Sequence, residues 1–183
     1  MITDNGLTFN TSWSSSQTIT SSVTSTTVVD ITGAGVGTAP SMINGPGAAN
    51  TAVGVDIGQG DGMAIPYVYV TVKTAFVSAG GALMTVTLQA APDNGSYSEG
   101  TYTTLYTSVA FTAAQLAAGQ TLMFQVPPRA LTGQPGEALP RFYRLSYTVS
   151  SSTFSAGAVN AGIVLNPPNG LVNTQYNSNF TAV

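Results

Sequence analysis

Hydrophobic and polar residues alternate along several short stretches of this chain. In the clearest stretch, residues 67–76, positions 68, 70, 72 and 76 are valine or phenylalanine, and the alternate positions from 67 to 73 carry hydroxyl or amine groups. Because successive side chains of a β-strand point to opposite faces, this alternation predicts a half-buried strand. The residues expected to point inward are Val68, Val70, Val72 and Phe76, and those expected to point outward are Tyr67, Tyr69, Thr71 and Lys73.

A second alternating stretch follows a short link that contains glycine. The link is Ser78–Gly81, and the residues expected to point inward after it are Met84, Val86, Leu88 and Ala90. Two alternating stretches with such a link between them are typical of an antiparallel hairpin. We therefore expect residues 67–91 to form one hairpin.

Further short strands are predicted at similar spacing. They cover residues 102–111, 122–126, 141–149 and 159–165, with shorter candidates at 17–20 and 26–31. Thr112 and Gln115 have the spacing of a capping box, and Gly119 is suited to end the helical turn that they begin. The glycine-rich segment between residues 33 and 62 has little periodicity and is predicted to be a long loop.

About eight short strands with one short helical turn are typical of an all-β protein. We expect an antiparallel, jelly-roll-like β-sandwich that forms a single domain over residues 1–165, including an N-terminal arm. Residues 166–183, which are neutral and aperiodic, are expected to form a C-terminal extended tail. A chain of 183 residues is long enough for one domain to bury a substantial core.

The composition of the chain excludes several classes of catalytic and metal site. The chain has no histidine and no cysteine, and only 6% of its residues are charged. Catalytic triads based on histidine, thiolate nucleophiles, and zinc sites built from cysteine or histidine are therefore excluded. We expect a protein that is not an enzyme, with no cofactor, no metal and no catalytic residues.

Charge also limits the choice of partners. The net charge is −3, and the only cations are Lys73, Arg129, Arg141 and Arg144. Four scattered cations cannot neutralise a run of phosphates, so we expect no nucleic-acid partner and no membrane partner. The first residues lack the basic and apolar regions of a signal peptide, so we expect synthesis in the cytoplasm without a cleaved export signal.

The carboxylates are the remaining candidates for chemistry. They are Asp4, Asp30, Asp56, Asp61, Asp93, Glu99 and Glu137. A catalytic pair of the glycosidase kind is conceivable, but most of these residues lie in turn-rich segments and are expected to be solvated. The stretch 56–62 faintly resembles a calcium loop but lacks the alternating ligands and the bidentate glutamate, so a glycine-rich lead-in to the strand is favoured.

Three of the cations lie in predicted strands. Lys73 is expected to be a solvated residue that protects the sheet against edge pairing. Arg141 and Arg144 are three positions apart and therefore point to opposite faces of a strand, so they cannot form one clamp. One of them is expected to pair with an acid and the other to serve an interface.

An ordered set of segments resembles one known family. The segments are residues 16–20, 25–31, 57–60, 67–91, 140–149 and 154–165. Together they are similar to the capsid cement (decoration) proteins of tailed phages of the Bordetella podophage type. The resemblance covers residues of about 8 to 165 and brings no catalytic residues with it.

The resemblance implies a structural virion protein on the outer surface of an icosahedral head. Its partners would be the phage major capsid protein, whose neighbouring subunits it would cement, and itself, as a homodimer rather than a trimer. The alternative is a jelly-roll binding module that recognises a carbohydrate or a host receptor, since Tyr67 and Tyr69 are expected on an exposed face.

Overall fold

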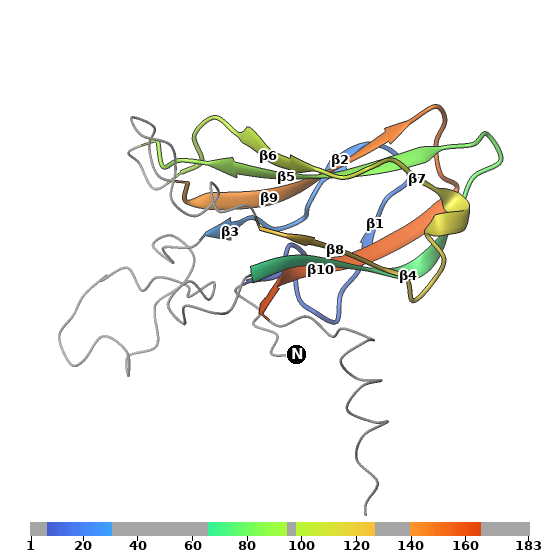
Figure 1. Cartoon of the computed structure of the whole chain (residues 1–183), viewed down its shortest axis with the longest axis horizontal. Helices are drawn as coiled ribbons and strands as arrows, with labels where there is room; N and C mark the ends of the chain where they lie inside the picture. The colour runs from blue at the N-terminus through green and yellow to red at the C-terminus, as the bar shows by residue number, and fades with distance from the viewer. Residues whose placement is uncertain (1–6, 31–65, 95–97, 127–139, 166–183) are drawn as a thin grey trace, which may run out of the picture.

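The computed structural model describes residues 7–30, 66–94, 98–126 and 140–165 (Figure 1). These residues form ten strands and one short 3-10 helix, η2. The elements are β1 (Gln17–Thr18), β2 (Val23–Thr24), β3 (Val29–Asp30), β4 (Pro66–Val77), β5 (Leu83–Ala91), β6 (Thr103–Thr107), β7 (Phe111–Thr112), η2 (Ala113–Gln115), β8 (Thr121–Gln125), β9 (Phe142–Ser150) and β10 (Ala156–Leu165).

The strands form two antiparallel sheets that pack face to face (Figure 1). Sheet A has the order β1-β10-β4-β8, and sheet B has the order β2-β9-β5-β6, with β3 added to β9 and β7 added to β5. Most connections cross from one sheet to the other, as the two Greek keys of a jelly roll require. The predicted all-β jelly-roll-like sandwich is therefore confirmed.

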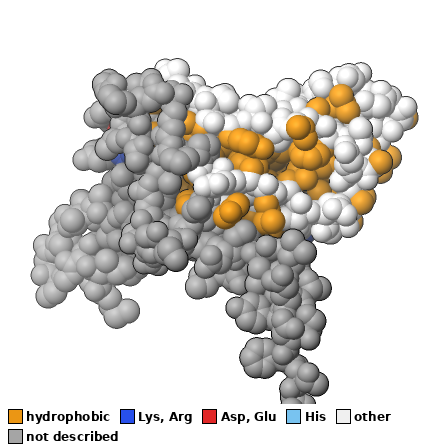
Figure 2. Space-filling model, viewed as in Figure 1, with side chains coloured by type: hydrophobic (Ala, Val, Ile, Leu, Met, Phe, Trp, Pro, Cys, Tyr) orange, Lys and Arg blue, Asp and Glu red, His pale blue; other side chains and the backbone are white. Residues whose placement is uncertain are grey.

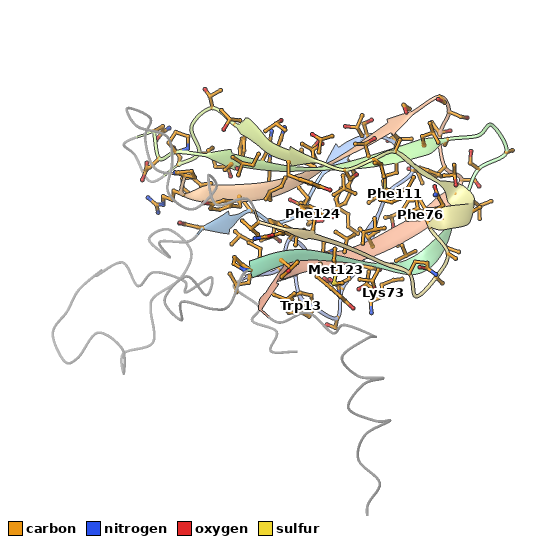
Figure 3. All side chains as sticks on the ribbon, viewed as in Figure 1. Trp13, Lys73, Phe76, Phe111, Met123 and Phe124 are labelled. Atoms are coloured by element: carbon orange, nitrogen blue, oxygen red, sulfur yellow. The ribbon has the colours of Figure 1, made fainter. Side chains whose placement is uncertain are left out.

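The core lies between the sheets and follows the alternation in the sequence. In β4 and β5, all eight residues expected to point inward are buried. The inner faces of β9 and β10 are buried as well, through Leu145, Tyr147, Val159 and Ile163. Phe76, Phe111 and Phe124 lie between the sheets in Figure 3. Period two in the sequence thus identified the inner face of each long strand correctly.

The predicted hairpin over residues 67–91 is wrong. β4 pairs with β10 and β8 in sheet A, whereas β5 pairs with β9 and β6 in sheet B. The link between them turns a corner, where the Ser78 hydroxyl accepts a hydrogen bond from the Ala82 amide at 3.0 Å and donates one to the Thr153 carbonyl at 3.2 Å. Alternation defines the buried face of a strand, and that pattern is the same for paired neighbours and for strands that face each other across the core.

Two further strand predictions need correction. The predicted strand over residues 102–111 is divided into β6 and β7, because the Ser108 side chain replaces a backbone ladder bond: its hydroxyl accepts from the Val86 amide at 2.9 Å. The stretch 26–31 contributes only Val29–Asp30 as a strand, and β2 precedes it.

The predicted helical turn is confirmed. The Thr112 amide donates to Gln115 Oε1 at 2.9 Å, which is one half of the capping box. Gly119 has φ +85°, a value that L side chains rarely adopt, so glycine suits the position where the chain leaves the turn. The loop at 33–62, its possible calcium motif and the tail at 166–183 lie outside the described residues.

Candidate functional site

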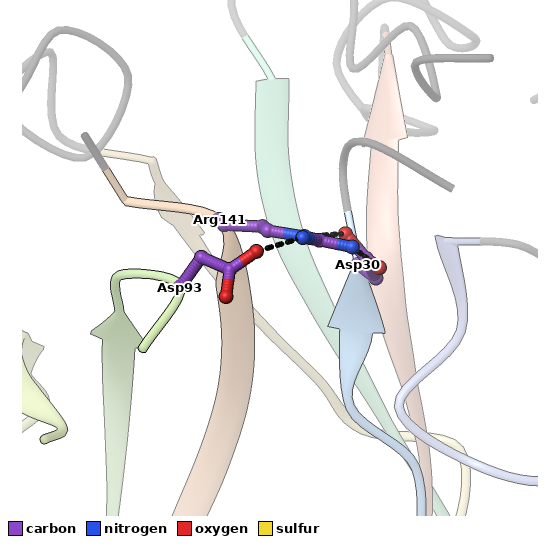
Figure 4. Close-up of polar contacts among 3 residues, drawn as sticks. All are labelled: Asp30, Asp93 and Arg141. Atoms are coloured by element: carbon purple, nitrogen blue, oxygen red, sulfur yellow. Dashed lines mark hydrogen bonds and ion pairs between the residues drawn. The ribbon is translucent and has the colours of Figure 1, made fainter. Parts of the chain in front are cut away.

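A buried ion cluster closes one end of sheet B. Arg141, directly before β9, donates from Nε to Asp30 Oδ1 at 2.9 Å and from Nη2 to Asp30 Oδ2 at 2.8 Å. It also binds Asp93 on its other side (Figure 4). The Arg141 and Asp30 side chains are only 8% and 7% exposed. The hydrogen bond to Asp30 raises the pKa of Arg141, so the guanidinium stays charged.

The cluster ties together three segments and has no free group for chemistry. Asp30 is the last residue of β3 and Asp93 follows β5, so Arg141 joins segments 111 and 48 positions away. The expectation that these acids are solvated turn residues is wrong for Asp30. Two carboxylates held by one guanidinium are poorly suited to act as a general acid and base. Asp4, Asp56, Asp61 and Glu137 lie outside the described residues.

Arg144 uses neutral partners on the outer side of sheet B. Its Nε donates to Gln89 Oε1 at 2.8 Å, and its guanidinium carbon lies 3.6 Å from the centre of the Tyr102 ring. Burial, together with Glu99, raises the pKa of Tyr102. The expectation that one arginine pairs with an acid is confirmed for Arg141, and an interface role for Arg144 stays a prediction.

A row of large side chains crosses the outer face of sheet A. Tyr69 on β4 is paired with Met123 on β8 and, on its other side, with Gly162 on β10. Gly162 has no side chain, and the Trp13 ring occupies the space, so that a Cβ at 162 would come within 2.5 Å of it. We call Trp13, Tyr69 and Met123 the outer row. Trp13 and Met123 lie on this side of the sandwich in Figure 3.

The N-terminal segment fixes the Trp13 end of the row. Asn10 donates to the Val159 carbonyl at 3.2 Å and accepts from the Ala161 amide at 2.7 Å, so its side chain pairs with the edge of β10. Asn160 donates to the Trp13 carbonyl from the neighbouring position. Because Asn10 and Asn160 are buried, these amide bonds are protected from competition with water.

Lys73 lies near one end of the outer face of sheet A and is exposed, as expected. The reason expected for it is wrong, because β4 is not an edge strand: β10 and β8 flank it on its two sides. In the described part of the chain, Lys73 is the only charged residue in a strand of sheet A.

The outer face of sheet B differs from that of sheet A. Across it, Thr24, Ser146, Thr87 and Thr107 are neighbours on four adjacent strands. Thr85 and Thr148 form the next row. We call these six residues the hydroxyl face. These side chains are short and polar, and Thr87 among them is buried. The Arg144 guanidinium and the Tyr102 ring lie on the same side of the sheet.

A second apolar surface lies where the sandwich opens between β6 and β8. Both are edge strands among the described elements, and the Tyr106 and Phe124 rings stack across the opening with centroids 4.2 Å apart. Half-buried Leu105, Phe111 and Leu122 pack against the same core. Figure 2 shows hydrophobic side chains gathered between the two sheets on this side. We call this surface the edge patch.

The sequence predicted Tyr67 and Tyr69 on the exposed side of β4, and the structure places them there, half-buried. It missed Trp13 and Met123. Trp13 lies in a serine-rich stretch without periodicity, and its position depends on a glycine nearly 150 residues away. Met123 could have been found, because it alternates with the inward Leu122 and Phe124.

Comparison with known proteins gives one result. The family model Bbp16 matches residues 13–163, which include nine of the ten strands, β10 as far as residue 163, and the three surfaces described above. No curated protein matches the chain. Among the described residues, no group of acidic side chains is arranged to hold a metal ion, and no helix has the length and hydropathy needed to span a membrane.

Proposed function

This chain belongs to the Bbp16 family, whose name fits a Bordetella phage protein, and on that premise we propose that it is a structural protein of the virion. It binds the outside of the icosahedral head and cements neighbouring subunits of the major capsid protein. The protein is made in the host cytoplasm and functions on the capsid surface. It works by contact and performs no chemistry.

One observation carries this proposal: among its described residues, the jelly roll presents two uncharged, largely apolar surfaces on different sides. The outer row crosses the outer face of sheet A, and the edge patch lies between β6 and β8. A cement protein must contact more than one neighbour at once, and two separate surfaces allow this. The described carboxylates Asp30 and Asp93 are already engaged in holding the fold.

The edge patch supports self-association. Edge strands expose unpaired amide and carbonyl groups that can pair with another chain, and here they lie beside half-buried Leu105 and Leu122. We propose that a second copy covers this patch and that the protein is a homodimer. Sedimentation of the pure protein should give a dimer, and Leu105→Glu should shift it toward monomer. A trimer, or a monomer at micromolar concentration, would contradict this assignment.

Head binding tests the function itself. Heads purified from phage that lack this protein should bind it saturably and should then withstand heating better than bare heads. Because the proposed contacts are mainly apolar, occupancy should change little between low salt and molar salt. Failure to bind the heads, or progressive loss as salt rises, would refute the proposed attachment.

Recognition of a carbohydrate is the second candidate. The Trp13 and Tyr69 rings on the outer face of sheet A are the observation in its favour, since such modules commonly present aromatic rings to a ligand. A glycan array separates the two functions. Binding to heads with a silent array supports the cement protein, and the reverse pattern supports a lectin.

A further inference from the structure

The outer row is held in position before any partner arrives. The loop that carries Trp13 is closed by Ser12 and Ser15, whose backbone and side-chain groups form four hydrogen bonds of 2.9 to 3.2 Å. Asn160 binds the Trp13 carbonyl, and Tyr69 lies on an interior strand of the sheet. Ordering side chains on binding costs free energy, so a surface that is already ordered favours docking.

The two outer faces differ in the residue types that protein interfaces select. Tryptophan, tyrosine and methionine are enriched in interfaces, whereas serine is depleted. The outer row consists of the first three types, and Met123 is 43% exposed at its end. The hydroxyl face carries serine and threonine instead. Arg144 and the Tyr102 ring also lie on the outer side of sheet B, but they pack against each other. The residue types therefore favour the outer row over the hydroxyl face as the docking surface.

Charge indicates what kind of partner covers sheet A. Lys73 is the only charged strand residue of this sheet, and the other described charges, Asp30, Asp93, Glu99, Arg141 and Arg144, belong to sheet B and its loops. In a two-fold contact between identical faces, the strands of sheet A would offer Lys73 no carboxylate. A different protein can place an acid opposite Lys73, so the charges favour such a partner over a second copy.

We infer that the outer face of sheet A is the surface that docks on the major capsid protein. The inference rests on the proposed function and names the face that carries it out. The outer row fills apolar hollows between capsid subunits, and Lys73 meets an acidic side chain at the margin. The hydroxyl face points away from the shell, and the edge patch remains available for the second copy.

Matched charge insertions test the inference. Met123→Glu places a carboxylate in the outer row, and Thr148→Glu places the same group on the hydroxyl face; both positions are exposed. We expect Met123→Glu to weaken binding to bare heads at least tenfold and Thr148→Glu to change it less than twofold. Circular dichroism and sedimentation should show that both variants keep the fold and the oligomeric state of the parent protein.

The outcomes separate failure of the inference from failure of the function. If the parent protein binds heads but Thr148→Glu is the damaging change, the docking face is wrong and the function stands. If Met123→Glu alters the oligomeric state instead of head binding, sheet A is the surface for self-association, which also refutes the inference. If the parent protein does not bind heads and binds a glycan through Trp13, the proposed function itself is wrong.

Lys73 provides an independent test. Lys73→Met removes the charge but keeps an unbranched apolar side chain. We expect a two- to fivefold loss of affinity for heads at low salt, and a smaller difference in molar salt, where ion pairs are screened. Equal affinity of Lys73→Met and the parent protein at low salt would show that no acid of the partner faces this position.

Discussion

The two sheets of the sandwich are stabilised by different kinds of contact. Sheet A is extended by the N-terminal segment, which binds the edge of β10 through the neutral amides of Asn10 and Asn160. Sheet B is closed at one end by the buried ion pair of Arg141 and Asp30, which the partly exposed Asp93 joins. In both sheets polar side chains are bonded within the fold, although Asn160 Oδ1 has no hydrogen-bond partner among the described residues. Only the first arrangement leaves the strands of its sheet with a single charged residue, Lys73.

This difference explains how a chain with few charges uses them. In sheet B, an arginine placed between two acids stabilises the fold and stays away from the outer surface. In sheet A, the one charged strand residue, Lys73, points outward beside the outer row. Among the described residues, the fold thus separates the charges of the ion cluster, which hold the structure together, from Lys73, which points outward on sheet A.

The largest expected loss of stability comes from a substitution that breaks the ion cluster of sheet B. Arg141→Leu removes the guanidinium that binds the buried Asp30 carboxylate, and removal of one member of a buried ion pair costs about 3–5 kcal/mol of folding free energy. Urea unfolding measures this cost. Lys73→Leu is the matched control in sheet A, because it removes the same charge at an exposed site and should cost about 0.5 kcal/mol or less. Equal costs for the two variants would contradict the contrast between the sheets.

The next largest loss of stability is expected from a substitution beneath the outer row of sheet A. Gly162→Ala places a methyl group against the Trp13 ring and the Leu7 carbonyl, so the variant should lose about 1–3 kcal/mol. Trp13 is the only tryptophan in the chain, so its fluorescence reports directly on this site. We expect emission to shift to longer wavelength as the ring becomes exposed.

A double-mutant cycle then shows whether the ring causes that loss. In a Trp13→Ala background, Gly162→Ala should cost measurably less, because only the Leu7 carbonyl still opposes the new methyl group. If the losses of folding free energy from the two substitutions are strictly additive, the Trp13 ring does not contact Gly162.

Alkaline pH should act on sheet B through its buried tyrosines. Burial raises the pKa of Tyr143 from 10.0 to about 12 and also raises that of Tyr147, both on the inner face of β9. Because the unfolded state ionises first, stability is complete below about pH 10 and falls as pH rises toward 12. The slope is about 1.4 kcal/mol per pH unit for each tyrosine. Unfolding curves from pH 9 to 12 measure it, and a flat profile would contradict the burial of these rings.

The smallest expected effect concerns the Tyr147 hydroxyl. It is fully buried and has no hydrogen-bond partner among the described residues. Tyr147→Phe should therefore leave stability at neutral pH unchanged or raise it by up to about 1 kcal/mol. It should also remove the contribution of one tyrosine, about 1.4 kcal/mol per pH unit, from the slope of stability against pH at alkaline pH. A loss of more than about 1 kcal/mol would show that the hydroxyl has a partner.

The local pattern of the sequence was sufficient to predict the long strands, but it did not predict which strands pair with each other. Alternation identified the inner faces of β4 and β5, and the spacing of Thr112 and Gln115 identified the turn. The same alternation suggested a hairpin that does not exist, because a strand with one buried face fits either sheet. Pairing depends on contacts between distant segments, on which a single sequence carries no local signal.

The surfaces show the same limit. The ion cluster joins Arg141 to an aspartate 111 positions away, and no motif links them in the sequence. The position of the Trp13 ring could not be predicted from the sequence either, because it depends on the space left by Gly162, which has no side chain. In contrast, the outward positions of Tyr69 and Lys73 followed directly from period two.

A cryo-EM map of mature heads tests the central claim most directly. The account predicts density for this protein on the outside of the shell, bridging neighbouring capsid subunits, with sheet A toward the shell and the hydroxyl face toward solvent. Heads without such density, or density with the Thr148 side of sheet B against the capsid, would contradict it.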